Sequence, residues 1–202
     1  MKKLFTLALL AVMALGANAQ DKKDDASKNK PVFTVVKSNP ITSIKNQNRS
    51  GTCWDFSGLS YFESEILKNT GKTYDLCEMF VANKTYMDRA VMSVRMHGDV
   101  SFAQGGSHFD VLYCICPENA MPLPGTLYGD TLANFNEFFD VLTPYVEAVA
   151  KSNAKTLTPA WKVGLQGILD SYLGKCPESF KYEGKTYTPK TFAESLGLKL
   201  DD

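Results

Sequence analysis

The sequence predicts an α+β protein that is mostly helical. Apolar residues recur at helical spacing in several long stretches, whereas strand-forming residues are confined to short runs near residues 33 and 180. The 202 residues contain 44% hydrophobic and 22% charged side chains, an ordinary globular composition, and their number suits one domain or one and a half. These observations predict a helical core with very little sheet.

The N-terminal residues have the pattern of a secretory signal peptide. Lys2 and Lys3 precede an apolar run, and the small residues Ala17-Asn18-Ala19 follow it. We expect cleavage after residues 1–19 and a periplasmic or secreted product. The apolar run is too short to span a bilayer and no cysteine follows the cleavage site, so no membrane anchor is expected. Lys plus Arg and Asp plus Glu number 22 each, which leaves no basic field for a nucleic-acid partner.

Residues 20–40 are expected to form a disordered spacer and one short strand. Residues 21–30 are rich in charge and offer almost nothing to bury, as disordered segments do. Residues 33–36 are strand-forming, and Pro40 closes this part of the chain.

Residues 41–120 are expected to form a half-domain built on helices. The first helix covers residues 52–69 and carries one apolar stripe. The second covers residues 74–96 and ends at residues 97–98. Its polar stripe is interpreted as a solvated face and consists of Asn83, Lys84, Asp88 and Arg89.

A third helix in this half-domain follows a turn of two glycines. Gly105 and Gly106 permit a tight turn, and Ser107 is the expected N-cap of a helix that runs to Ile115. By itself, a pair of glycines indicates no more than a surface loop.

Residues 121–202 are expected to form a helical insertion with a small hairpin. The run from Met121 to Gly125 holds two prolines and marks the boundary. A helix over residues 132–151 is expected to bend or restart at Pro144. The remaining expected elements are a helix with Thr158 as N-cap and Gly174 past its end, a hairpin of residues 180–182 and 185–187, and a short helix from Thr188-Pro189 to Gly197.

Cys53 is placed for nucleophilic chemistry at the start of the first helix. A thiol attacks a carbonyl as thiolate, and the unpaired N–H groups of a first helical turn stabilise negative charge. The Cys53 N–H and the Gln47 amide could both donate to the oxyanion that such an attack creates. Gly51 lets the backbone come close beside the thiol. The alternative is a buried structural cysteine at a helix start.

The five cysteines indicate that at least one thiol does not pair within the chain. Cys53 is the expected free one. Cys114 and Cys116 diverge on a helix and have no further ligand beside them, so they are interpreted as core residues rather than zinc ligands. No metal and no cofactor is expected.

The segment from Gln47 to Ser57 resembles the nucleophile segment of papain-like cysteine peptidases. Gln47, Cys53 and Trp54 match that motif. The resemblance implies that Cys53 is the nucleophile, that Gln47 contributes to the oxyanion hole and that Trp54 lies beside the substrate. It thereby implies a peptide as substrate.

The same resemblance assigns a role to Gly105 and Gly106, which would line the cleft and pair with the substrate backbone as a short strand. A plain loop remains the alternative for them. Two residues depart from the family pattern. Asn48 stands where a glycine is usual, and Asp55 would place a negative charge near the thiolate and raise its pKa.

Later segments resemble the bleomycin hydrolase and aminopeptidase C branch of these peptidases. The similar runs are residues 78–81, 84–86, 173–180 and 187–192, and the likeness spans residues 41–200. It implies the N-terminal (left) half of a papain-like fold with a helical insertion. Members of that branch assemble as hexamers, which implies a homo-oligomer for a full-length form.

The catalytic histidine of the family has no counterpart at its expected place. It should follow the nucleophile by about 130–150 residues, with an asparagine to orient it. The two histidines of this sequence, His97 and His108, both come much earlier. We therefore expect an N-terminal part of a cysteine aminopeptidase, without the second, β-rich half and inactive alone. Catalysis with His108 as substitute base and a non-catalytic peptide-binding or remnant fragment are the alternatives.

Overall fold

A computed structural model describes residues 31–111 and 135–197 and divides the chain into two units, residues 1–38 and 39–202. In the first unit, the described residues 31–38 form neither helix nor strand. The strand expected over residues 33–36 is therefore wrong. Val32, Phe33, Val35 and Val36 are each more than four-fifths exposed, and none has the paired backbone that a strand needs.

Several expectations lie outside the described residues. They are the signal peptide, the spacer over residues 20–30, the boundary at residues 121–125, and the placement of Cys114 and Cys116. None of the described helices is long and apolar enough to cross a membrane.

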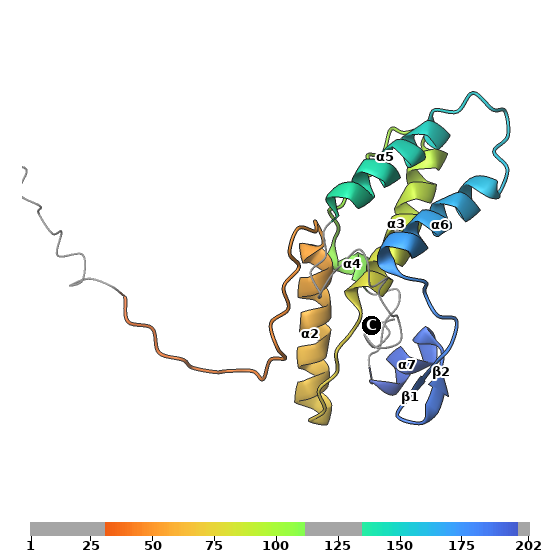
Figure 1. Ribbon diagram of the computed structural model, residues 1–202. Helices are drawn as coiled ribbons and strands as arrows, with labels where there is room; N and C mark the ends of the chain where they lie inside the picture. Colours follow the sequence, from red (N-terminus) through yellow and green to blue (C-terminus); the bar gives the residue numbers. More distant parts are fainter. Residues whose placement is uncertain (1–30, 112–134, 198–202) are drawn as a thin grey trace, which may run out of the picture. The chain divides into compact units, whose positions relative to one another are not determined.

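The second unit is mostly helical, with one two-stranded antiparallel sheet (Figure 1). This agrees with the predicted α+β class. Its described elements are α2 (Cys53–Thr70), α3 (Glu78–Arg95), α4 (His108–Val111), α5 (Asn136–Ala150), α6 (Ala160–Leu173), β1 (Phe180–Tyr182), β2 (Lys185–Tyr187) and α7 (Pro189–Ser195).

Helix α3 is the element on which the unit is built, because it packs against α2, α4, α5 and α6. It begins at Glu78, four residues later than expected, and ends where predicted, because His97 and Gly98 both have positive φ. The solvated-face interpretation of its polar stripe is wrong for Asn83. This side chain is fully buried, and its Nδ2 donates to the Gly174 carbonyl at 3.1 Å. Helix α6 covers this side of α3, so Asn83 joins two helices.

Aromatic side chains fill the space between α3 and α5. The Tyr86 ring lies with its centroid 5.1 Å from that of Phe139, edge to face, and Phe102 stacks on Phe139 from the loop after α3. Helix α5 continues through Pro144 without interruption, so the expected restart there is wrong. The cluster holds the loop at residues 99–107 against α3, and this loop carries the two glycines.

The C-terminal elements follow the sequence prediction closely. Strands β1 and β2 pair Phe180 with Tyr187 across a turn in which Glu183 and Gly184 both have positive φ, as a tight hairpin requires. Thr188 caps α7 by accepting from the Thr191 N–H at 3.2 Å. The N-cap of α6 is Pro159, one residue after the expected Thr158.

Candidate active site

The segment that leads to the candidate nucleophile is anchored by Lys45. Its ammonium lies 2.8 Å from Glu78, 3.1 Å from Glu63 and 2.6 Å from Asp75. It also donates to the Leu76 carbonyl at 2.8 Å. Burial alone would lower the pKa of Lys45, but the neighbouring carboxylates, Glu78 foremost, raise it above its ordinary value. The charged lysine therefore fixes this segment against α2 and the start of α3.

Gln47 begins a tight turn that brings its amide back toward the helix start. Its Nε2 donates to the Ser50 carbonyl at 2.7 Å, and the Ser50 hydroxyl donates to the Gln47 carbonyl at 2.8 Å. An amide nitrogen carries two N–H donors, so one remains for an oxyanion. Asn48 has φ of 48°, the left-handed conformation that asparagine tolerates better than most residues. This explains how Asn48 replaces the glycine that is usual in the motif.

Cys53 is the first residue of α2, and it is exposed. The alternative of a buried structural cysteine is therefore wrong. The first helical bonds run to the Thr52 carbonyl, from Asp55 N–H at 3.0 Å and from Phe56 N–H at 3.1 Å. Within residues 31–111 and 135–197, no hydrogen bond is present for the Cys53 N–H, so this donor and the thiol share the helix start.

Gly51 and Gln104 join the turn that precedes Cys53 (residues 47–52, the nucleophile turn) to the loop at residues 99–107 (the glycine loop). The Gly51 N–H donates to Gln104 Oε1 at 2.7 Å. A Cβ on Gly51 would lie 2.6 Å from the Cβ of Gln104, so the close approach requires a glycine. Sequence reasoning placed the need for Gly51 correctly but did not identify Gln104, whose partner is 53 residues away.

Trp54 forms the surface on which the glycine loop lies. Its Nε1 donates to the Gln104 carbonyl at 3.0 Å, and the Tyr86 hydroxyl donates to the same carbonyl at 3.2 Å. A Cβ on Gly106 would overlap the Trp54 indole ring, whereas a Cβ on Gly105 would meet nothing within 4 Å. The two glycines therefore differ: Gly106 is required for packing, and Gly105 is sterically free.

Arg89 holds the glycine loop in place, a role that the sequence analysis did not identify. Its guanidinium stands 5.5 Å from the Trp54 ring centroid and donates from Nη1 to the Gly105 carbonyl. Nη2 pairs with Asp110 at 2.7 Å, and Asp110 also accepts from the Ser107 N–H at 2.8 Å. Ser107 directly precedes α4, as an N-cap does, but its hydroxyl donates to Asp110 at 3.2 Å instead of accepting from a helix N–H. The solvated-face interpretation is wrong for Arg89, because its side chain is only 27% exposed and its donors bind Gly105 and Asp110, 16 and 21 residues later.

Asp55, beside the thiol in sequence, points into the interior. It is fully buried, and neither carboxyl oxygen has a hydrogen-bond partner in the described parts of the chain. Burial raises the pKa of Asp55 well above its usual range, and the Glu78 carboxylate adds to this shift, while Lys45 opposes it. Burial therefore favours the neutral acid, which weakens the expected effect of an Asp55 charge on the thiolate.

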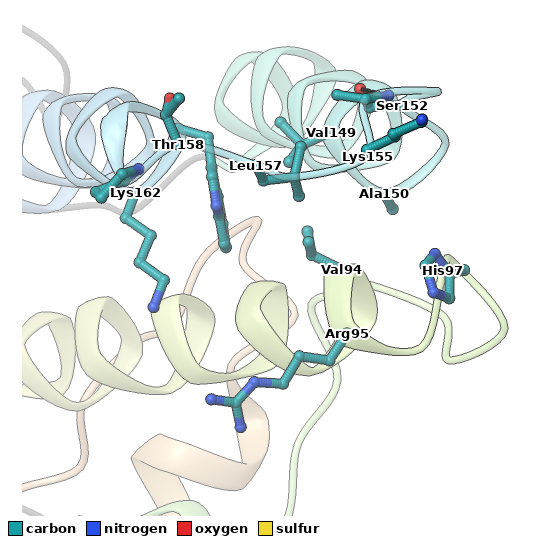
Figure 2. A pocket seen from close by; sticks show the side chains of 13 residues that line it. Val94, Arg95, His97, Val149, Ala150, Ser152, Lys155, Leu157, Thr158 and Lys162 are labelled. Atoms are coloured by element: carbon teal, nitrogen blue, oxygen red, sulfur yellow. Dashed lines mark hydrogen bonds between the residues drawn. The ribbon is translucent and has the colours of Figure 1, made fainter.

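The two histidines lie at different places, and neither is bonded to Cys53 within the described residues. His97 follows the end of α3 and lines a pocket with α5 and the start of α6 (Figure 2). His108 begins α4, and its Nδ1 lies 3.4 Å from the position of a Cβ on Gly58. Gly58 is five residues after Cys53, which corresponds to about 7.5 Å along a helix axis. Cys53 and Trp54 therefore lie beside the turn of Gln47 and the glycine loop, and no histidine of the described residues is bonded to the Cys53 thiol.

Comparison with known proteins gives a likeness in fold. No family model and no curated protein matches this sequence. Among solved structures, the chain is similar to the crystal structure of PepW from Lactobacillus rhamnosis HN001 (DR20), with 21% sequence identity and a TM-score of 0.58. The match covers 98% of this chain and 53% of the PepW chain. This chain therefore spans about half the length of the solved chain, with which it shares a partial fold.

Proposed function

We propose that this chain forms the nucleophile side of a cysteine peptidase site of the papain-like, bleomycin hydrolase type. The observation that carries the proposal is the double contact of Gln104, which binds the Gly51 N–H and the Trp54 indole N–H at once. This contact supports a site in which the exposed Cys53 lies beside the exposed residues Gly105 and Gly106. The sequence motif and the partial fold shared with PepW support this proposal.

In this proposal, the Cys53 thiolate attacks the carbonyl carbon of a peptide bond. The oxyanion accepts from the Cys53 N–H and from the second N–H of the Gln47 amide. Collapse of the intermediate leaves a thioester on Cys53 and expels the amine, which must receive a proton; water then releases the acid and restores the thiol. The peptide backbone pairs with the exposed Gly105–Gly106 edge.

The proton donor is the part of this chemistry that the described residues do not supply. His108 lies against α2 beside Gly58 rather than at the thiol. We therefore propose that the isolated chain binds peptides and reacts through Cys53 but does not turn them over. Non-catalytic peptide binding is the second candidate function, favoured by the rigidly held loop and the absence of a bonded histidine at Cys53 among the described residues.

The experiment compares two electrophiles on the purified chain. Leucyl-leucyl chloromethyl ketone offers a peptide backbone, and iodoacetamide offers none. Labelling of the Cys53 peptide is followed by mass spectrometry from pH 5 to 9, with Cys53→Ala as control and with an aminopeptidase assay in parallel. We expect the ratio of the peptidyl-reagent rate to the iodoacetamide rate to be higher in the folded chain than in the urea-unfolded chain. If this ratio is equal in the folded and unfolded chain, both candidate functions are refuted. Peptide turnover that depends on His108 would refute the proposal that the isolated chain is inactive.

Export is a separate part of the proposal and has its own measurement. If residues 1–19 act as a leader, the protein recovered from the secreted or periplasmic fraction begins at Gln20. Intact-mass analysis of the exported chain checks this, and a chain that keeps Met1 in the cell would contradict it. Homo-oligomers, a property of relatives in the proposed family, are checked by light scattering on the same material.

A further inference from the structure

A pocket lies at the C-terminal end of α3, where α5 ends and α6 begins (Figure 2). Its volume is about 440 Å³, within the range of sites that hold small molecules. None of the residues that line it belongs to the Cys53 site. The proposed peptidase chemistry therefore does not account for it.

The inner wall of this pocket is apolar and comes from three parts of the chain. Val94 of α3, Val149 of α5 and Leu157 of the connecting loop face the same space in Figure 2. Trp161 of α6 also lines it and is half-buried. Leu157 keeps 37% of its surface exposed to solvent. An apolar ligand group would bury more of this surface.

The rim of the pocket is basic and holds no acidic side chain. Arg95, Lys155 and Lys162 line it together with His97, and no Asp or Glu of the described residues does. In Figure 2, Lys155 and Lys162 lie on opposite sides of the pocket, and the Arg95 side chain lies on the far side of α3 from Val94. Among the described residues, none of these three cations has a carboxylate within 4.0 Å. Residues 148–169 contain three lysines and no acidic residue. Because the whole chain has equal numbers of basic and acidic side chains, this is a local excess of positive charge.

The start of α6 adds to the same field. Thr158 and Pro159 line the pocket, and no side chain in the described part of the chain caps this 14-residue helix. Its first N–H groups carry the partial positive charge of the helix dipole. The basic rim and this helix end both favour an anionic group, while the wall of Val94, Val149 and Leu157 favours an apolar one.

We propose that this pocket binds a small amphiphilic carboxylate, with its apolar body on the inner wall and its carboxylate on the Lys162 side of the pocket, at the start of α6. A medium-chain fatty acid and the C-terminus of a short apolar peptide share this chemistry. A cationic amphiphile of the same length has the same apolar body and the wrong charge. The proposal does not depend on the reactivity of Cys53.

The experiment is a fluorescence and calorimetric titration of the purified full chain. The probes are decanoate, acetyl-leucyl-leucine with a free carboxylate, and decyltrimethylammonium as the charge control. Trp161 lines the pocket and reports binding, and Trp161→Phe assigns the fluorescence signal. We expect saturable binding of at least one carboxylate and much weaker binding of the ammonium compound. Binding of decanoate alone identifies a lipid source for the ligand, and binding of the dipeptide alone identifies a peptide source.

Two pairs of charge reversals test the location of the site. Lys155→Glu combined with Lys162→Glu should weaken carboxylate binding by about tenfold, because two attractive charges become repulsive. Lys181→Glu combined with Lys185→Glu on the hairpin makes the same change of net charge away from the pocket and should change affinity less than about twofold. Circular dichroism confirms that each variant is folded. Absence of saturable carboxylate binding, equal binding of the ammonium compound, or equal loss in both double variants would overturn the proposal.

Discussion

Replacement of Arg89 by methionine tests whether the glycine loop must be held in place for peptide recognition. Methionine keeps an apolar side chain near the Trp54 ring but removes the donors to the Gly105 carbonyl and to Asp110. The loop would keep its contacts through Gln104, so the chain should still fold. The change therefore releases the outer part of the loop and leaves the nucleophile turn intact.

The expected loss of stability follows from three interactions. A hydrogen bond from a charged donor contributes about 1.5–3 kcal/mol. The ion pair with Asp110, whose side chains are 27% and 22% exposed, adds about 0.2–1 kcal/mol, and the cation–π contact adds about 0.5–1 kcal/mol. Methionine recovers part of the packing on Trp54. We expect a net decrease of about 2 kcal/mol in the free energy of unfolding.

Urea denaturation measures this stability, and Cys53 labelling measures the function. Arg89 does not contact Cys53 in the structure, so the iodoacetamide rate should change less than about twofold. The rate with leucyl-leucyl chloromethyl ketone should fall by about tenfold, which corresponds to about 1.4 kcal/mol of lost backbone recognition. Arg89→Lys restores the charge without the two-pronged geometry and should be intermediate. Lys84→Met, at an exposed position of the same helix, is the matched control.

One result would refute this reasoning. If Arg89→Met lowers stability but leaves the ratio of the two labelling rates unchanged, Arg89 has a purely structural role. The Gly105–Gly106 edge would then not be the peptide-binding element.

Three further predictions concern the same unit. Gly106→Ala should abolish the preference for the peptidyl electrophile and destabilise the fold, because its Cβ overlaps the Trp54 ring, whereas Gly105→Ala should retain stability; urea denaturation and Cys53 labelling of both variants check this. Asp55 has a raised pKa in the folded state, so the stability it contributes is present below the unfolded pKa and is lost as pH rises through the folded pKa. The free energy of unfolding of Asp55→Asn should therefore decline less with rising pH than that of the parent chain. Identical pH profiles of the two chains would contradict this. Lys45→Met leaves Glu63 buried without its cation and should cost about 3–5 kcal/mol, measured by thermal unfolding; a loss below about 1 kcal/mol would show that the carboxylates find other partners.

The first helix and the C-terminal hairpin were predictable from the sequence because their determinants are close together in the chain. The hairpin turn needs positive φ at both Glu183 and Gly184, and Gly184 is the residue that adopts it without strain. The helix that begins at Cys53 carries its apolar stripe and its Gly71 cap within 19 residues. In these cases the physical cause is local backbone conformation or periodicity.

Only the tertiary structure decided which polar residues contact the candidate site and which residues are buried. Arg89 and Asn83 appear in the sequence as parts of one polar stripe, yet one binds the glycine loop and the other is buried against α6. Asp55 appears as a charge beside the thiol and is instead enclosed without a partner in the described chain. Residues 33–36 have strand-forming side chains but no neighbouring strand in the described chain to pair with. Each of these outcomes depends on partners brought together by folding, which short-range sequence patterns do not encode.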